Sequence, residues 1–386
     1  METTAAFRGL RCTECGERTE PGTERCPDCH GLLVGDYDVP ELTPADLPDA
    51  TGPARYEPLL PFPAAEAVSL DEGATPLVSV PELAAELDVA AVYVKDEGRN
   101  PTGSLADRKL SLSVTAAAQR GAERVATPST GNGAQASAAY AARAGLESTG
   151  FVPSRCPFLN KAMVNVHGGD MRVVEGRYTD AVDAFREDDG DWTGVAPGDP
   201  FRVEGAKSVA FEVLEDLAWS APDAVVQPTG HGETLVGLHE GFDAATESGL
   251  TDAGPRLYAV QPDTAAPVAE AWADGRAEPV PTEHPDTVVG PLEVPDPAAG
   301  EAALGAIEAS DGGAVSVEDK ETLRGAVDCC ELGPEVGATG GTAVAGARTL
   351  AARGAFEADD VVVLVNPVAG SKEADLLRSH LMSRGL

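Results

Sequence analysis

The sequence predicts an α/β protein in which helices cover buried parallel strands. Short, mostly apolar segments recur along the chain, and stretches with helical periodicity lie between them. This alternation is typical of βαβ units, because a parallel strand is reached only through a crossover connection. The 386 residues are 42% hydrophobic and 24% charged, which is the balance of a folded chain with a substantial core.

The chain begins with two Cys-x-x-Cys knuckles, Cys12/Cys15 and Cys26/Cys29. Ten residues separate the knuckles, so the chain can turn back and bring four thiolates to the corners of a tetrahedron. This closed arrangement favours a structural zinc ion; the alternative is two separate dithiol pairs. We therefore predict a zinc ribbon over residues 1–36. The remaining cysteines lack this spacing and are interpreted as buried small side chains, namely Cys156, Cys329 and Cys330.

A linker arm and a core follow the ribbon. Residues 37–69 are rich in Pro, Asp and Glu with little periodicity, which predicts an extended arm. The core is expected over residues 70–386, with a smaller subdomain at about 100–190 and a larger one from the remainder.

The expected strands and helices of the core alternate. The apolar segments predicted as strands are Ala91–Val94, Met171–Val174, Ala224–Val226, Leu257–Val260 and Val361–Val365. The segments predicted as helices are Ser111–Arg120, Ala134–Ala144, Lys207–Trp219, Asp319–Cys330 and Gly341–Ala352.

The formal net charge of −36 limits the partners. Such a chain repels nucleic acid and anionic membranes, and its self-repulsion is relieved by salt. The acidic excess is spread along the chain and is similar to that of haloarchaeal proteins from a salt-rich cytoplasm. Neither a membrane span nor a signal peptide is indicated, so we expect a cytoplasmic protein.

Three glycine-rich turns each follow an expected strand. Backbone N–H groups at such turns and at helix N-termini bind anionic ligands at the carboxyl ends of strands. The turns therefore predict a site for an anionic ligand. They are Ser129-Thr130-Gly131-Asn132-Gly133, Pro228-Thr229-Gly230-His231-Gly232-Glu233-Thr234 and Asn366-Pro367-Val368-Ala369-Gly370-Ser371-Lys372.

Together with Asn100-Pro101-Thr102-Gly103-Ser104-Leu105-Ala106-Asp107-Arg108, these turns resemble the cofactor site of threonine synthases, which are fold-type II pyridoxal phosphate enzymes. The similarity covers nearly the whole core, and some threonine synthases also carry an amino-terminal zinc ribbon. The resemblance implies a two-domain core like that of tryptophan synthase β. It also implies the conversion of O-phospho-L-homoserine and water to L-threonine and phosphate.

The resemblance assigns a role to each turn. Ser129, Thr130, Gly131 and Asn132 would hold the cofactor and the substrate carboxylate, with Asn132 facing the ring hydroxyl. Gly230, His231, Gly232, Glu233 and Thr234 would hold the phosphate, although a loop histidine such as His231 is also a common polar turn residue. Pro367 would lie near the pyridine nitrogen.

Three positions depart from the family pattern. Ala106 stands where the family has the lysine that forms the Schiff base and moves substrate protons, and a methyl group does neither. Glu233 brings a like charge to a phosphate loop. Pro367 replaces a hydroxyl donor. Lys109, one helical turn after Ala106, is a candidate substitute amine or an ordinary helix lysine.

Three accounts of function follow. The first is a pseudoenzyme that binds a small anionic, amino-acid-like ligand and forms a homo-oligomer or pairs with an active paralogue. The second is an active threonine synthase or lyase that uses Lys109 or another amine. The third is a structural or interaction protein whose ribbon and acidic surface matter. We favour the first, because Ala106, Glu233 and Pro367 all weaken the grip on one ligand.

Overall fold

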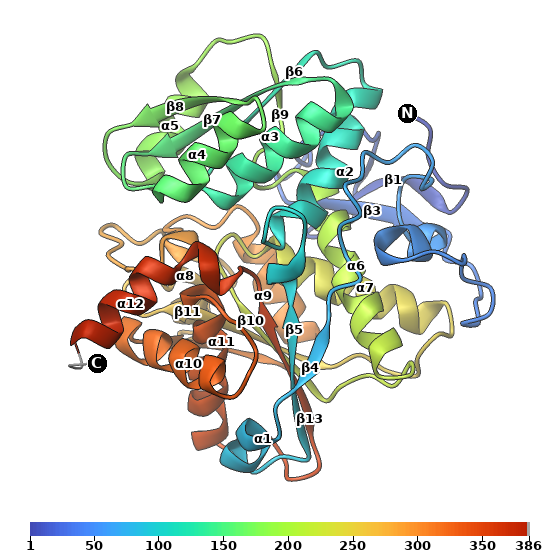
Figure 1. The fold of residues 1–386 in the computed structure, drawn as a ribbon. Helices are drawn as coiled ribbons and strands as arrows, with labels where there is room; N and C mark the ends of the chain where they lie inside the picture. Colours follow the sequence, from blue (N-terminus) through green and yellow to red (C-terminus); the bar gives the residue numbers. More distant parts are fainter. Residues whose placement is uncertain (384–386) are drawn as a thin grey trace. The chain divides into compact units, whose positions relative to one another are not determined.

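The computed structural model describes residues 1–383 as two compact units (Figure 1). Unit 1 contains Met1–Ala74, Ala106–Phe211 and Val236–Leu250, and unit 2 contains Thr75–Leu105, Glu212–Leu235 and the chain from Thr251 onward. Two of the five unit boundaries fall inside helices, namely α6 (Pro200–Asp216) and α7 (Glu233–Glu247). The predicted core extends to residue 386, and residues 384–386 lie outside the described part. Within that part, no helix has the length and apolar character needed to cross a membrane.

Unit 1 begins with a small antiparallel sheet. Its strands are β1 (Phe7–Cys12), β2 (Arg18–Thr19) and β3 (Leu33–Tyr37), in the order β2-β1-β3. Leu10 and Leu33 on the paired strands β1 and β3 are fully buried. Cys12 is the last residue of β1, and Cys15, Cys26 and Cys29 lie in the connections between the three strands. The sheet therefore positions both knuckles.

The segment predicted as an extended arm is folded against unit 1. It contains the 3-10 helix η1 (Gly52–Leu59). Tyr56 is buried and packs on Phe211, with ring centroids 5.3 Å apart, and Phe62 stacks on Phe201 at 5.2 Å. These aromatic contacts, which are spaced without periodicity, anchor the segment.

A buried polar network joins the small sheet to helix α6. Glu204 is fully buried and accepts hydrogen bonds from the Gly35 backbone N–H (2.8 Å) and the Tyr37 hydroxyl (2.5 Å). The Lys207 ammonium lies 3.5 Å from the same carboxylate and 3.9 Å from the centroid of the Tyr37 ring. Burial of the Tyr37 hydroxyl raises its pKa well above 10.0, and the negative charge of Glu204 adds to this shift.

The second sheet of unit 1 is parallel. Its strands are β6 (Arg124–Pro128), β7 (Glu147–Pro153), β8 (Asp170–Val174) and β9 (Thr193–Gly194), in the order β8-β7-β6-β9. Its helices are α2 (Ala106–Gln119), α3 (Asn132–Ala144), α4 (Phe158–Val166) and α5 (Tyr178–Glu187). Helix α3 can approach β7 closely because Gly150 has no side chain. A Cβ at this position would lie only 2.8 Å from that of Ala134.

Unit 2 contains a six-stranded sheet in the order β12-β11-β10-β13-β5-β4. Its strands are β4 (Leu77–Ser79), β5 (Ala91–Asp96), β10 (Ala224–Pro228), β11 (Arg256–Pro262), β12 (Gly313–Val317) and β13 (Val361–Asn366). All neighbours are parallel except β4, which pairs antiparallel to β5. The five predicted strands are therefore present, four of them in this sheet and one as β8. The prediction of a buried strand is wrong for β8, because it lies at the edge of its sheet and its residues are exposed or half-buried.

Helices cover the sheet of unit 2. They are α1 (Pro81–Leu87), α8 (Pro267–Ala273), α9 (Gly300–Ala309), α10 (Asp319–Glu331), α11 (Ala338–Ala352) and α12 (Ala374–Ser383), with 3-10 turns η2 (Glu97–Arg99), η3 (Gly290–Leu292) and η4 (Gly370–Lys372). Side chains of α1, α10 and α11 share one buried cluster with alternate residues of the strands, such as Val226 and Leu364. The predicted helix over 207–219 ends earlier, at Asp216, since Ala218 and Trp219 adopt left-handed backbone angles.

Candidate functional site

The four knuckle cysteines form one compact cluster in unit 1. The sulfur of Cys12 lies 3.4 Å from that of Cys29, and the Cys15 and Cys26 sulfurs are 3.5 Å apart. All four sulfur atoms lie within 4.8 Å of one another. Four thiolates at about 2.3 Å from a central zinc ion are separated by distances of this order.

The surroundings of the cluster also fit a metal. Backbone N–H groups of Cys29 and Asp28 donate to the Cys26 sulfur and lower its pKa to about 7, whereas the pKa of Cys29 in the same cluster is raised to about 12. Gly31 closes the site, because a Cβ there would lie 2.9 Å from the Cys12 sulfur and 3.3 Å from that of Cys29. The donor set leaves no position for a substrate, so a zinc ion here would be structural.

The first predicted ligand turn lies at the carboxyl end of β6 in unit 1. Ser129 is buried, and its hydroxyl accepts a hydrogen bond from the Gly131 backbone N–H at 3.0 Å. Gly131 has a φ of +146°, and a Cβ there would lie 3.1 Å from both Asn160 and Cys156. Glycine is therefore required at this turn, and the N-terminus of α3 follows directly.

Asn160, which the sequence reasoning missed, fixes the orientation of Asn132. Its Nδ2 donates to Asn132 Oδ1 at 2.8 Å, and only 3% of Asn160 is exposed. Because Oδ1 is the acceptor in this contact, Nδ2 of Asn132 is the end that offers hydrogens to a ligand oxygen. Asn160 lies in α4, 28 residues after Asn132, so no local pattern identifies it.

Ala106 is the first residue of α2. Its half-buried methyl group packs beside a cluster that includes Leu110, Val114 and Val125. The neighbouring Asp107 and Arg108 are buried, and Arg108 donates to the Ser208 hydroxyl at 3.0 Å. The start of α2 is thus firmly positioned in unit 1, and residue 106, where the resemblance places a lysine, carries only a methyl group.

The chain contains six lysines, and five of them hold described hydrogen bonds or ion pairs elsewhere. The Lys95 ammonium is fully buried, 2.9 Å from Glu212 and 3.1 Å from Asp216. Lys320 is exposed, and hydrogen bonding to Glu318 raises its pKa. The others are Lys161, Lys207 and Lys372. Lys109 is half-buried on α2, one turn after Ala106, and this position alone makes it the candidate substitute amine.

The second predicted turn lies in unit 2, between β10 and α7. The segment that follows η3 covers it, since a Cβ on Gly230 would lie 3.2 Å from Val294. Gly232 has a φ of +88°, and a Cβ there would lie 2.8 Å from the Ala299 carbonyl oxygen. His231 Nδ1 accepts from the Ala298 backbone N–H at 3.3 Å, so the ring is anchored by the backbone and its neutral form carries the proton on Nε2.

Glu233 is the first residue of α7 and is only 1% exposed. Its side chain therefore does not turn out into solvent. An anionic side chain is stabilised at a helix N-terminus by the N–H groups and the helix dipole. The same N–H groups are what a bound phosphate would use, so the carboxylate of Glu233 and a phosphate dianion compete for one environment.

Pro367 follows β13, which is the neighbour of β10 in the sheet. The Pro367 carbonyl oxygen accepts from the Leu105 N–H at 2.9 Å. Two buried polar atoms beside Pro367, Ser104 Oγ and Asn366 Oδ1, have no hydrogen-bond partner among the described residues. Proline itself offers no donor to a ring nitrogen.

These residues fit pyridoxal phosphate only in part. The turn from Ser129 to Asn132 retains its donors. In contrast, Ala106 supplies no amine, Glu233 places a buried carboxylate in the phosphate turn, and Pro367 supplies no donor. Taken one by one, the residues of these turns therefore do not match a covalently held phosphate cofactor.

The comparisons with known proteins agree with the fold. A model of the pyridoxal-phosphate dependent enzyme family matches residues 68–367. The chain is 32% identical over 365 residues to threonine synthase of Methanosarcina acetivorans, covering 92% of this chain and 90% of that one. Maize serine racemase has a similar structure, with a TM-score of 0.67 and 19% identity over 81% of this chain and 94% of that one. A lysine-to-alanine mutant of O-ureido-L-serine synthase, bound to O-ureido-L-serine, gives a TM-score of 0.64 and 23% identity over 81% and 93% of the two chains.

Proposed function

Because the chain belongs to the pyridoxal-phosphate dependent enzyme family and is threonine synthase-like, we propose that it is a member that has lost covalent cofactor chemistry. In this proposal it retains a site for a small anionic, amino-acid-like ligand. The observation that carries the proposal is Ala106 at the first position of α2, where the resemblance places the lysine.

The first argument concerns covalent chemistry. A Schiff base needs a primary amine, and the same amine returns protons to the substrate in this family of reactions. Ala106 has neither the nitrogen nor the reach. Lys109 starts about 4.5 Å further along the helix axis, and a displacement of even 1 Å can cost about a hundredfold in rate.

The second argument concerns the phosphate. Two like charges about 4 Å apart repel by roughly 4 kcal/mol at an effective dielectric near 20. Glu233 is buried, so this repulsion is not relieved by rotation into water. A ligand without a phosphate avoids it. The proposed ligand is therefore an amino-acid-like carboxylate that contacts Asn132.

The solved lysine-to-alanine mutant of O-ureido-L-serine synthase supports the ligand part of the proposal. That protein has the same fold and was bound to O-ureido-L-serine. A protein of this fold with a lysine-to-alanine change thus holds an amino acid derivative. By analogy, Ala106 is compatible with a bound amino-acid-like ligand here.

The test is a search for a cofactor imine. The purified protein is mixed with pyridoxal phosphate in molar potassium chloride, reduced with borohydride and mapped by peptide mass. We expect no lysine to be modified stoichiometrically. Stoichiometric modification of Lys109 that disappears in Lys109→Ala would refute the proposal. It would favour the alternative, an active enzyme that makes L-threonine and phosphate from O-phospho-L-homoserine.

Restoring the site gives a second test. Ala106→Lys alone should bind the cofactor weakly, because Glu233 and Pro367 still oppose it. Ala106→Lys with Glu233→Gly and Pro367→Thr should show a stronger imine absorption band. Ala106→Met is the matched control, since it adds a chain of similar length without the amine. Full cofactor binding by Ala106→Lys alone would show that Glu233 and Pro367 do not oppose the cofactor.

The remaining expectations are also proposals. A structural zinc ion at the four-cysteine cluster is supported by the sulfur distances. A cytoplasmic location is an expectation from the sequence, as is a homo-oligomer or a complex with an active paralogue. Size-exclusion chromatography with light scattering in molar salt would test the oligomer.

A further inference from the structure

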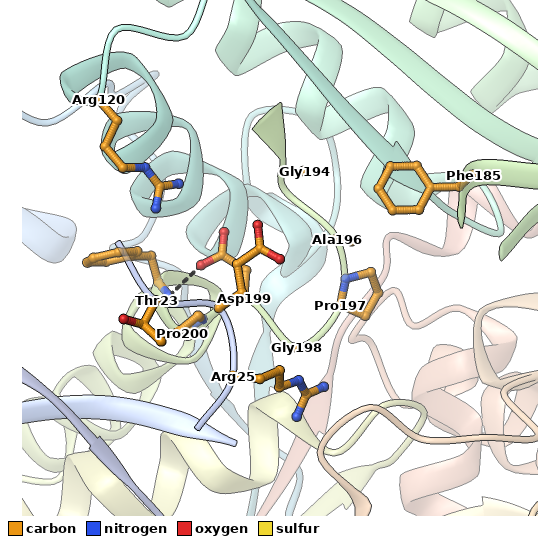
Figure 2. Close-up of a pocket in the computed structure, with 12 residues that line it drawn as sticks. Thr23, Arg25, Arg120, Phe185, Gly194, Ala196, Pro197, Gly198, Asp199 and Pro200 are labelled. Carbon is orange, nitrogen blue, oxygen red and sulfur yellow. Dashed lines mark hydrogen bonds between the residues drawn. The ribbon is translucent and has the colours of Figure 1, made fainter. Parts of the chain in front are cut away.

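A cavity of about 120 Å³ lies in unit 1, away from the residues of the proposed ligand site (Figure 2). The ribbon contributes Thr23 to Arg25, the turn after α2 contributes Arg120, and the chain from Gly194 to Phe201 forms much of the remaining wall. Pockets for drug-sized ligands have volumes of about 300 Å³ or more. This cavity therefore suits a molecule of only a few heavy atoms.

The polar wall of the cavity carries both signs of charge. Figure 2 shows the Arg120 guanidinium directed toward the Asp199 carboxylate, with Arg25 on the other side of Asp199. The Asp199 carboxylate is held in place by the Ser113 hydroxyl and by the Phe201 backbone N–H, which donates at 2.9 Å. A carboxylate accepts further hydrogen bonds beyond these two, so Asp199 can still meet a ligand cation.

Arg25 is positioned by a glycine. Gly198 has a φ of +95°, and a Cβ there would lie 2.3 Å from a terminal nitrogen of Arg25. The guanidinium of Arg25 thus packs directly on the Gly198 backbone. Any side chain at position 198 would push Arg25 away, so this wall of the cavity depends on a residue without a side chain.

The cavity also has apolar lining residues. They include Phe185, Pro197 and Phe201, and Figure 2 shows the Phe185 ring at the far side from Arg120. Two guanidinium groups suit a carboxylate, the acidic residues Asp199 and Glu24 of the lining suit an ammonium group, and the apolar residues suit a short hydrocarbon side chain.

We propose that this cavity is a second ligand site, which binds a small α-amino acid. The ligand carboxylate contacts Arg25 and Arg120, its ammonium group contacts Asp199, and its side chain faces Phe185. Because Arg25 belongs to the ribbon and Arg120 directly follows α2, the bound amino acid joins these two parts of unit 1. Binding therefore raises the melting temperature.

Isothermal titration calorimetry with L-valine and L-threonine in molar potassium chloride tests the proposal. At this salt the Debye length is about 3 Å, so only direct contacts contribute. We expect both amino acids to bind. Acetate has only the carboxylate and methylammonium only the ammonium group, so each should bind at least tenfold more weakly. Arg120→Gln and Asp199→Asn should each weaken binding about tenfold or more.

Two variants control for other effects. Arg124→Gln, which removes an exposed ion pair with Glu147 in the same unit, should leave binding unchanged. Asn132→Ala, at the site of the proposed function, should remove only the binding at that site and leave the binding that depends on Arg120 in place, and so separates the two sites. Gly198→Ala should displace Arg25 and weaken binding, and Arg120→Gln provides the same information if that variant does not fold.

The outcomes are distinguishable. Absence of any heat with either amino acid at millimolar concentration overturns the proposal. So does amino acid binding that Arg120→Gln leaves unchanged but Asn132→Ala abolishes, because the ligand would then occupy the other site. Binding of inorganic phosphate with no binding of amino acids would show a plain anion site instead.

Discussion

Glu204→Gln should destabilise unit 1 far more than the loss of a surface charge. The carboxylate is fully buried and receives hydrogen bonds from Gly35 and Tyr37, with the Lys207 ammonium 3.5 Å away. The variant keeps one acceptor oxygen, and the Gly35 N–H can still use it. The variant removes the negative charge, however, and leaves the ammonium group of Lys207, which is only 2% exposed, without its counter-ion.

The magnitude follows from burial. Removing one partner of a buried ion pair typically costs about 3–5 kcal/mol, because the remaining charge stays desolvated. The cation–π contact between Lys207 and the Tyr37 ring offsets part of this, on the order of 1–2 kcal/mol for a desolvated pair. We therefore expect a loss of about 1–4 kcal/mol in the free energy of unfolding.

The assay is urea unfolding in molar potassium chloride, followed by tryptophan fluorescence and circular dichroism. Asp38→Asn is the matched control, since Asp38 follows β3 and its ion pair with Arg8 has both side chains more than half exposed. That exposed pair should contribute less than about 1 kcal/mol. The double variant Glu204→Met/Lys207→Met should cost less than Glu204→Gln, because no buried charge is left alone. Equal losses for Glu204→Gln and Asp38→Asn would refute the reasoning.

Further outcomes are expected for the ribbon, for salt and for pH. Metal analysis should find about one zinc per chain, and Cys15→Ser should abolish it; a cysteine crosslink without zinc would contradict this. Gly31→Ala should weaken zinc binding while all four ligands remain, since its Cβ would crowd the Cys12 sulfur at 2.9 Å. The melting temperature should rise between low and molar potassium chloride because of the net charge of −36; an unchanged midpoint would be inconsistent. Since the folded state raises the pKa of Tyr37 above 10.0, the folded chain keeps a proton that the unfolded chain releases, so stability should fall as pH rises through about 10, and less so in Tyr37→Phe.

Much of the fold is readable from the sequence because its signals are local. The apolar run Val361–Val365 predicts a buried strand, and the turn from Ser129 to Gly133 predicts the start of a helix at the end of another strand. Both predictions are confirmed. The two knuckles likewise predict a four-sulfur cluster, which the structure contains.

The missed features depend on contacts between distant residues. Asn160 orients Asn132 across 28 positions of sequence. Glu204 likewise binds residues far away in the sequence, Gly35 and Tyr37, which lie in β3. The burial of Glu233 is also set by packing, and a sequence that places a glutamate in a polar turn gives no sign of it. The same limit applies to the arm, whose aromatic anchors have no period.

The order of strands in the sheet of unit 2 has a consequence for synthesis. Strand β13 follows β4, β5, β10, β11 and β12 in the sequence, yet it lies between β10 and β5. On the ribosome, the nascent chain therefore carries two incomplete half-sheets until Val361–Asn366 has been made. Until then the facing edges of β5 and β10 are apolar and unpaired, which is the kind of edge that promotes aggregation. A nonsense codon or a protease cut shortly before Val361 would leave the sheet split through its middle, so such fragments should accumulate as insoluble material or be degraded.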